Sequence, residues 1–307
     1  MAAAETRVYL VVGATGPVGL GGEICRLLRA GGKATRALVR ATAAPERVAG
    51  LRDVGVELVP GDLRDSRSLE AACRGVHAVI STASIMVSRQ PSDTVENVDA
   101  GGQATLVDAA GAAGVESVQY VSFSGHIDRA FPFRDAKRAV ERHLKQSGLA
   151  YTILRPTFLM EVWLSPVAGF DFQNARATIY GRGEHRLSWM SFHDVARFAV
   201  TFLDHPAARD RTFELGGPEA LSPHEVVRIF EEIGGRRFAL EHVPEEQLEE
   251  QDATAPDSLQ RSFAGLRRCY AAGDIIDMRD TLASFPVSLT SVRDYARQVL
   301  SARMNGS

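Results

Sequence analysis

The sequence predicts an α/β protein built on a doubly wound parallel sheet, followed by a smaller α+β lobe. Short runs rich in Val, Ile and Leu alternate with helical segments through the first half of the chain, which places helices on the faces of a parallel sheet. This alternation fails after Arg155-Pro156. We therefore expect a sheet domain over residues 1–157 with a returning segment at 188–216, and mainly a substrate-binding lobe over 158–307.

Apolar periodicity and turn residues give the expected elements of the first domain. The predicted strands are Val8–Val12, Thr35–Val39, Val56–Val59, Ala78–Ser81, Ser117–Val121 and Tyr151–Leu154. The predicted helices are Val18–Ala30, Ser66–Cys73, Val95–Ala113 and Ala136–Gln146. Gly31 and Gly32 should end the first helix in the left-handed conformation that glycine tolerates.

Helix-start signals are also present in the expected second lobe. Ser191–Asp194 and Ser222–Glu225 have the spacing of a capping box, although the first has Asp where Glu or Gln is usual. Thr290 or Ser291 is expected to begin the last helix.

Composition and charge exclude several classes of protein. The 307 residues are 45% hydrophobic and 24% charged, which is ordinary for a globular chain. A net charge of −3 provides no positive field for nucleic acid. No apolar segment reaches the ~20 residues that cross a bilayer, and no export signal is recognisable. We expect a cytoplasmic protein with no nucleic-acid or membrane partner; its oligomeric state is not predicted.

Cysteine and histidine spacing predicts neither a disulfide framework nor a metal site. The cysteines, Cys25, Cys73 and Cys269, are odd in number and widely spaced, and no paired Cys/His pattern occurs. Cys25 and Cys73 lie among apolar neighbours in predicted helices, so we expect buried free thiols.

The glycine-rich segment after the first strand is the main cofactor signal. Val8–Val12 leads directly into Gly13-x-x-Gly16-x-x-Gly19 and then into a helix. Glycines allow a tight turn and a close backbone approach, and the helix N-terminus attracts a pyrophosphate. This context predicts a Rossmann-type dinucleotide site that involves Gly13, Thr15, Gly16, Pro17, Val18 and Gly19.

The residue after the second strand predicts which dinucleotide is preferred. An acidic residue near this position holds the ribose hydroxyls of NAD, but this chain has Arg40. A guanidinium here is suited to the 2′-phosphate of NADP, with Arg36 or Arg47 as possible helpers. The alternative is a surface arginine that begins a loop. We take NADP(H) as the expected cofactor.

Further motifs resemble the NmrA-like, isoflavone-reductase-like branch of the atypical short-chain dehydrogenases/reductases. They are Gly13-Ala-Thr-Gly16, Val121-Ser-Phe-Ser-Gly125, Lys137-x-x-x-Glu141, Ser147-Gly-Leu-x-Tyr-Thr-Ile-Leu-Arg155-Pro156, Asp194-Val-Ala196 and Leu215-Gly-Gly-Pro218. The resemblance covers roughly Arg7 to Ile233. It implies a dinucleotide across the sheet's strand ends, with the C-terminal lobe closing a substrate pocket over the nicotinamide.

The resemblance also implies roles for residues at the strand ends. Asp62 and Leu63 would approach the adenine, although Asp62 is equally suited to cap the next helix. Thr82, Ala83 and Ser84 would pass beneath the dinucleotide. Pro156, Thr157 and Phe158, after the sixth strand, would complete the cofactor site.

The chain departs from the family pattern at the expected proton donor. Main-type short-chain reductases use Tyr-x-x-x-Lys, but Phe133 stands four residues before Lys137, and a phenyl ring donates no proton. By resemblance, Lys137 would anchor the nicotinamide ribose or act as the acid. Without the resemblance, it would be an exposed lysine on a basic helix.

Other candidates for catalysis follow the fifth strand. If the chain stays extended, the alternate residues Ser122, Ser124 and His126 would face one side, with His126 able to supply the missing proton. Otherwise His126 is a solvated loop residue. The aromatic residues Trp163, Phe170, Phe172 and Trp189 would line an apolar substrate pocket or simply form core.

Two functions therefore remain in competition. The first is an NADPH-dependent reductase, such as a ketoreductase, that transfers hydride to a carbonyl, quinone or conjugated double bond of a small apolar or aromatic molecule. The second, which the resemblance allows, is a non-catalytic NADP(H) sensor that contacts a partner protein. Phe133 favours the sensor, whereas Ser122 and Lys137 favour the enzyme.

Overall fold

The computed structural model describes residues 7–86, 89–127 and 129–304. Their main sheet has seven strands in the order β3-β2-β1-β4-β5-β6-β9, and neighbours from β3 to β6 run parallel. The strands are β1 (Val8–Val12), β2 (Ala34–Val39), β3 (Glu57–Pro60), β4 (Ala78–Ser81), β5 (Ser117–Val121), β6 (Ala150–Pro156) and β9 (Arg211–Leu215). The predicted α/β fold with a parallel sheet is confirmed.

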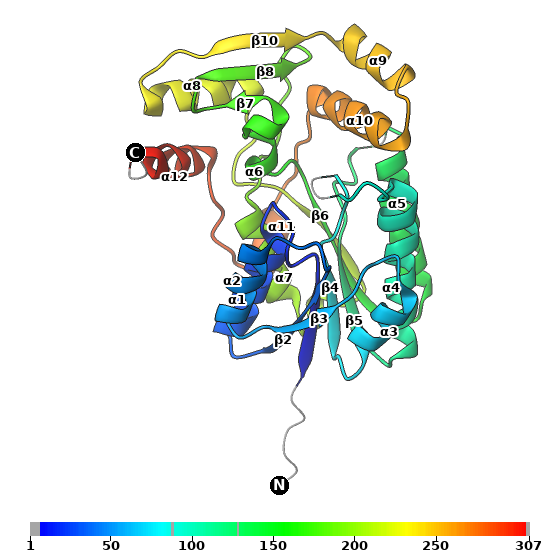
Figure 1. The fold of residues 1–307 in the computed structure, drawn as a ribbon. Coiled ribbons are helices and arrows are strands. Elements are labelled where there is room, and N and C mark those ends of the chain that lie inside the picture. The colour runs from blue at the N-terminus through cyan, green and yellow to red at the C-terminus, as the bar shows by residue number, and fades with distance from the viewer. Residues whose placement is uncertain (1–6, 87–88, 128, 305–307) are drawn as a thin grey trace. The chain divides into compact units, whose positions relative to one another are not determined.

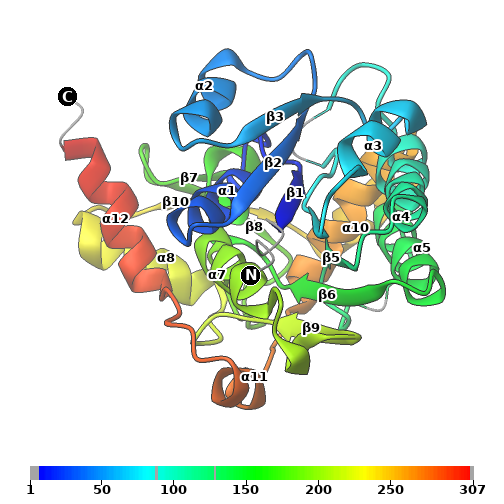
Figure 2. The ribbon, with the colours of Figure 1, turned by 90° about the horizontal axis from the view of Figure 1, so that it is seen from below.

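Helices cover both faces of this sheet. Figure 2 shows α1 and α7 on one face and α4 and α5 on the other. The helices are α1 (Leu20–Ala30), α2 (Pro45–Asp53), α3 (Ser66–Cys73), α4 (Gln103–Ala112), α5 (Pro132–Gln146) and α7 (Phe192–Phe202). The strand order reverses at β1, because β2 and β3 lie on one side of it and β4 to β6 lie on the other. Open α/β sheets bind ligands at the carboxyl ends of the strands where this reversal occurs.

The chain divides into two compact units. The first unit comprises residues up to 122, 133–154 and 196–213, and the second comprises 123–132, 155–195 and the residues from 214 on. The segment returning to the first unit is therefore 196–213. The short segment 123–132, placed in the predicted sheet domain by sequence, belongs to the second unit.

The second unit contains a three-stranded sheet in the order β10-β8-β7 (Figure 1). Its strands are β7 (Phe170–Asp171), β8 (Arg176–Tyr180) and β10 (Ala239–Val243). Its helices are α6 (Met160–Trp163), α8 (Pro223–Gly234), α9 (Glu245–Ala253), α10 (Ser258–Ala272), α11 (Arg279–Ser284) and α12 (Val292–Met304), with a short 3₁₀ turn at Pro166–Ala168. A second 3₁₀ turn, Pro206–Ala208, belongs to the first unit. β8 runs parallel to β10 and antiparallel to β7.

The segment predicted as one helix over 95–113 is divided. A π-helix spans Val95–Gly102 and continues into α4. A capping box between Thr94 and Asn97 starts it. A Cβ at Gly102 would lie 2.9 Å from the Cβ of Leu63, so this helix approaches the loop after β3 closely. π-Helical turns occur frequently at functional sites.

The observed N-caps of α3 and α8 test two helix starts that the sequence predicted. The Asp65 side chain accepts the Arg67 amide and caps α3, so the expectation that Asp62 caps this helix is wrong. Asp62 instead accepts the Arg64 amide within the preceding loop. The capping box predicted at Ser222 is confirmed at the start of α8.

The termini of two other helices also agree with the sequence. Ser291 accepts the Asp294 amide at the start of α12, as predicted. Gly32 has a φ of 72°, so the left-handed end of α1 is confirmed there, whereas Gly31 has a φ of −81°.

Aromatic side chains of the second unit pack against one another. Trp163 stacks on Tyr270 with a centroid separation of 5.0 Å, and Phe170 packs edge-on against Phe230 at 4.8 Å. Trp189 is fully buried and donates to the Leu221 carbonyl. Phe170 and Trp189 are thus core residues.

The cysteines are buried free thiols, as predicted for Cys25 and Cys73. Burial raises the pKa of Cys25 to about 12 and that of Cys73 to about 11. In the described ranges, no group of three or more His, Cys, Asp or Glu side chains is placed to hold a metal ion. No described helix is both long and apolar enough to traverse a bilayer.

Gly21 provides a test of how closely α1 packs on the turn before it. A Cβ at Gly21 would lie 2.6 Å from the Gly13 carbonyl oxygen and 2.9 Å from the Ala14 Cα. We expect Gly21→Ala to lower the free energy of unfolding by about 1–3 kcal/mol, the usual effect of overpacking. Gly50→Ala is the control, because nothing lies within 4 Å of its added Cβ. Equal stabilities of the two variants in urea unfolding would contradict the close packing.

Candidate functional site

The turn between β1 and α1 is built on backbone that only glycine accommodates well. Gly13 and Gly19 have φ values of 96° and 99°, in the left-handed region. A Cβ at Gly13 would lie 2.6 Å from Thr82 Oγ1 and 2.8 Å from the Ala83 amide nitrogen. The turn therefore packs directly against the end of β4, as a dinucleotide-binding turn requires.

The start of α1 is suited to an anion. Gly19 is its N-cap residue and no side chain caps it by a hydrogen bond, so the first amides of the helix remain for another acceptor. Arg47 donates to the carbonyls of Gly16 at 2.7 Å and Pro17 at 3.2 Å. Arg47 thus braces the glycine-rich turn through its backbone carbonyls and places a positive charge beside the turn.

The segment after β4 is held by a buried glutamine. Gln103 accepts from Ser81 Oγ at 2.8 Å and donates to the Ala83 carbonyl at 2.9 Å. Thr82 donates to the Val12 carbonyl, joining this segment to β1. The Ser84 hydroxyl accepts the Met86 amide. Thr82, Ala83 and Ser84 are therefore held at the end of β4, beside the turn after β1.

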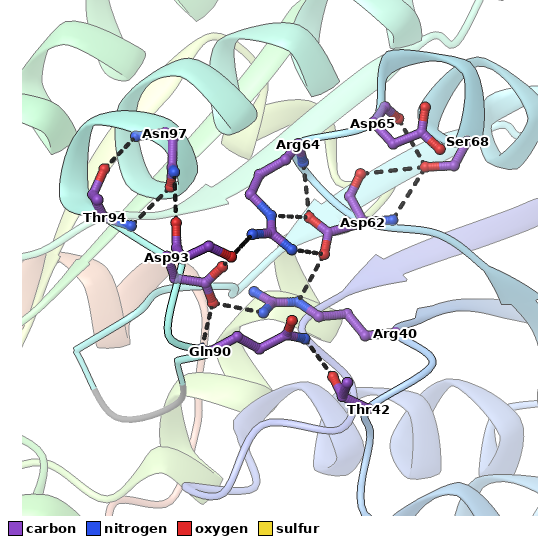
Figure 3. Close-up of polar contacts among 11 residues, drawn as sticks. Arg40, Thr42, Asp62, Arg64, Asp65, Ser68, Gln90, Asp93, Thr94 and Asn97 are labelled. Carbon is purple, nitrogen blue, oxygen red and sulfur yellow. Dashed lines mark hydrogen bonds and ion pairs between the residues drawn. The ribbon is translucent and has the colours of Figure 1, made fainter.

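Arg40 lies in a cluster of charged side chains at the ends of β2 and β3 (Figure 3). Its Nη1 is 2.7 Å from Asp93 Oδ2, and its Nε is 3.7 Å from Asp62 Oδ2. Arg64 forms two hydrogen bonds of 2.9 Å to Asp62 and lies 3.2 Å from Asp93. The hydrogen bond from Arg64 lowers the pKa of Asp62.

Arg36 and Leu63, which the sequence also predicted near the adenosine half of the dinucleotide, lie outside this charged cluster. Arg36 donates to the carbonyls of Ala72 and Arg74 and pairs with Glu57. Its guanidinium is therefore engaged at the end of α3 and does not support Arg40. Leu63 is buried against the π-helix.

Lys137 is buried, which excludes the alternative of an exposed lysine on a basic helix. Only 3% of its side chain is exposed. Its Nζ donates to the Val121 carbonyl at 3.2 Å and lies 3.9 Å from Asp99 Oδ1. Burial lowers the pKa of Lys137 and raises that of Asp99, while each charge opposes the shift of the other.

Aromatic rings enclose the same ammonium group. Lys137 Nζ is 4.8 Å from the centre of the Tyr120 ring and 5.2 Å from that of Phe133. The phenyl ring of Phe133 thus lies beside the ammonium group and carries no hydroxyl. The Tyr120 hydroxyl is buried as well, and burial raises its pKa well above the ordinary value. The Lys137 ammonium group thus lies in a buried, low-dielectric environment, with the carboxylate of Asp99 beside it.

The Ser122 hydroxyl forms hydrogen bonds with two side chains of α5. Its hydroxyl donates to Glu141 Oε1 and accepts from Arg138 at 3.2 Å. Because β5 ends at Val121, the strand alternation that predicted a shared face with Ser124 and His126 stops before these residues. The structure does not bring Ser122 into the group that Ser124 and His126 form.

In the second unit, Ser124 and His126 converge on Asp274. Asp274 accepts from Ser124 at 3.1 Å and from Thr157 at 2.7 Å, and His126 Nδ1 lies 3.4 Å from it. Burial raises the pKa of Asp274. The imidazole is half-exposed while its carboxylate partner is fully buried. The half-exposed imidazole therefore lies beside a carboxylate that water does not reach.

Nearby backbone holds the same segment in place. The Gly125 amide donates to Glu214 at 2.8 Å, and Glu214 pairs with Arg155. The Pro156 carbonyl accepts the Ser124 amide, and Phe158 packs edge-on against Trp163. Pro156, Thr157 and Phe158 thus belong to the second unit together with His126.

Sequence reasoning missed several polar residues of these groups. They are Arg64, Asp93, Asp99 as the partner of Lys137, Gln103 and Asp274. No spacing rule links Asp274 to Ser124, which lies 150 residues away.

Comparison with known proteins gives a family and several relatives. The model of the NmrA-like family matches residues 5–292. The chain is 30% identical over 288 residues to the isoflavone reductase homolog IRL of Zea mays, covering 89% of each. It is 31% identical to the NAD(P)H azoreductase of Xenophilus azovorans, covering 75% of this chain and 74% of the relative.

Other relatives have names that describe no reduction. The photosystem II assembly factor Ycf39 of Trieres chinensis is 28% identical, covering 76% of this chain and 72% of the relative.

Among solved structures, isoflavone reductase aligns with a TM-score of 0.75 at 23% identity, over 96% of this chain and 100% of the other. An Escherichia coli quinone oxidoreductase complexed with NADPH aligns with a TM-score of 0.74 at 21% identity, over 95% and 99%. These two structures share the fold.

Gly16 tests whether the turn binds a dinucleotide. Its φ is outside the left-handed region, and an added Cβ would meet only the Gly13 oxygen, at 3.2 Å. We expect Gly16→Val to remain folded by circular dichroism but to lose binding of NADPH and NADH, because the branched side chain blocks the backbone amides. Gly111→Val, on α4 with nothing within 4 Å, is the matched control. Unchanged NADPH affinity in folded Gly16→Val would remove the turn from the site.

Proposed function

Because this chain belongs to the NmrA-like family, we propose that it is an NADPH-dependent reductase of a small, mostly apolar substrate. The reaction is hydride transfer to a carbonyl, a quinone or a conjugated double bond. The observation that carries the proposal is the buried Lys137–Asp99 pair in the same unit as the glycine turn. Burying an ammonium group costs free energy, and catalytic sites are where such groups are concentrated.

The residues present fit NADP(H). The glycine turn and the uncapped start of α1 suit the pyrophosphate, and Arg40 suits the 2′-phosphate. Thr82 to Ser84 and Asp62 with Leu63 would lie along the dinucleotide. When bound, NADPH supplies the hydride. The relative from Xenophilus azovorans is named for NAD(P)H, which supports a nicotinamide cofactor here.

The protein's own task is to hold the substrate and to deliver one proton. Hydride transfer to a carbonyl or enone leaves a negative oxygen or carbon, which must gain a proton to complete the reduction. Lys137 serves as the proton donor or as the anchor of the nicotinamide ribose. His126, oriented by Asp274, is the second candidate donor. Ser124 and Thr157 hold Asp274, and Ser122 supports α5 through Glu141.

The second candidate function is a non-catalytic NADP(H) sensor. The specific observation in its favour is Phe133, whose buried ring stands at the usual tyrosine position. Relatives named as photosystem II assembly factors add support. In a sensor, nucleotide occupancy would alter contact with a partner protein, and the purified chain would bind NADPH without consuming it in the presence of acceptors.

Arg40 tests the cofactor preference. We expect Arg40→Ala to weaken NADPH binding about 10- to 100-fold, since charge-assisted hydrogen bonds are worth roughly 1.5–3 kcal/mol. NADH binding should change little because NADH lacks the phosphate. The measurement is a fluorescence titration with both nucleotides, and Arg36→Ala is the control on the same strand. Equal losses for NADPH and NADH would place Arg40 outside the phosphate site.

Lys137 and His126 separate the enzyme from the sensor. With a panel of ketones, quinones and enones, we expect Lys137→Ala to lower turnover by about 10²-fold or more. If Lys137 anchors the ribose, the NADPH dissociation constant also rises. If it is the acid, the constant stays nearly unchanged and one limb of the pH–rate profile flattens.

His126→Ala and Lys145→Ala complete this experiment. A larger defect in His126→Ala than in Lys137→Ala would transfer the acid role to the histidine. Lys145→Ala, exposed on the same helix, should retain full turnover. Normal NADPH binding in all variants, with no reduction of any acceptor by the wild type, would replace the reductase with the sensor.

A further inference from the structure

Arg40 and the three charged side chains around it neutralise one another. Arg40 and Arg64 carry two positive charges, and Asp62 and Asp93 carry two negative charges, all within ion-pair distance of an opposite partner. Figure 3 shows the two guanidinium groups between the two carboxylates. The end of the site proposed for adenosine is therefore less positive than a lone arginine would make it.

Asp93 is the closer and more deeply buried of the two carboxylates that face Arg40. Its side chain is 0% exposed, compared with 22% for Asp62. Its Oδ2 also accepts the Gln90 amide at 2.8 Å. Because water does not reach this carboxylate, its charge acts on Arg40 with little screening.

We propose that Asp93 is a specificity-determining residue that restrains the preference for NADP(H) by neutralising Arg40, so that the site also accepts NAD(H). This inference rests on the proposed function, because it assumes that the glycine turn binds a nicotinamide dinucleotide. An incoming 2′-phosphate must compete with Asp93 for Arg40 and is repelled by it. A ribose with a free 2′-hydroxyl carries no such charge.

The adenosine halves of the two cofactors isolate this effect from the rest of the dinucleotide. The ligands are 2′,5′-ADP, which carries the 2′-phosphate, and 5′-AMP, which does not. We expect Asp93→Asn to tighten 2′,5′-ADP binding about tenfold, a change of about 1.4 kcal/mol, with 5′-AMP affinity within about twofold of wild type. Calorimetric titration of the full-length protein measures both constants. The gain should shrink at high salt, because it arises from charge.

Asp65→Asn is the matched control. Asp65 lies in the same loop as Asp62, and the same loss of one negative charge occurs there, but its side chain caps α3. Asparagine preserves this cap well. We expect Asp65→Asn to leave the ratio of the two affinities unchanged. A general effect of net charge would instead move the ratio in both variants.

A second variant guards against misfolding of Asp93→Asn. Asp62→Asn removes the negative charge of the other carboxylate that faces Arg40, while Arg64 keeps its ion pair with Asp93. The affinity for 2′,5′-ADP relative to 5′-AMP should therefore rise in the same direction. Thermal unfolding shows which variants are folded.

The outcomes distinguish this inference from the proposed function. Weaker 2′,5′-ADP binding in folded Asp93→Asn would overturn the inference, because Asp93 would then be needed to hold Arg40 in place. Equal shifts for both ligands would overturn it as well. If full NADPH and NADH bind the wild type with the ratio unaltered in Asp93→Asn and Asp62→Asn, only the inference falls. If the wild type binds neither dinucleotide, the proposed function falls, and the inference falls with it.

Discussion

The close approach of the Gly13 backbone to its neighbours is the constraint on which the candidate site depends. The turn packs against Thr82 and Ala83 on one side and against Gly21 of α1 on the other, with no room for a Cβ at either glycine. This packing holds the turn against the end of β4, and no side chain caps the start of α1 by a hydrogen bond. Arg47 donates to the carbonyls of Gly16 and Pro17 in the same turn. The proposed binding of a pyrophosphate depends on these backbone positions.

Three fully buried carboxylates each lie beside a basic side chain. Lys137 faces Asp99, Arg40 faces Asp93, and His126 faces Asp274. A buried pair contributes little net stability, because desolvation offsets the attraction between the charges. In the Lys137–Asp99 pair, each charge opposes the pKa shift that burial causes in the other. Groups with perturbed pKa values are concentrated at functional sites.

The surroundings of Lys137 suit both proposed functions. The phenyl ring of Phe133 lies 5.2 Å from its ammonium group, and burial lowers the pKa of the lysine. Such a lysine suits proton transfer or the binding of a ribose hydroxyl. A sensor needs only the second role, whereas a reductase needs a proton donor as well. In the proposed reductase, His126 beside the buried carboxylate of Asp274 is the second candidate donor.

The sequence by itself determined the parallel α/β sheet, the glycine turn and the family, because these depend on local periodicity and on backbone conformations that glycine favours. Several strand bounds, such as Val8–Val12 and Ser117–Val121, agree with the prediction for this reason. The tertiary structure alone decided that Lys137 is buried, that Asp93 neutralises Arg40 from 53 residues away, and that Asp274 meets Ser124 and His126. A charged side chain has the same letter in the sequence whether it is solvated or buried. Only the packing of distant segments removes its water and selects its partner.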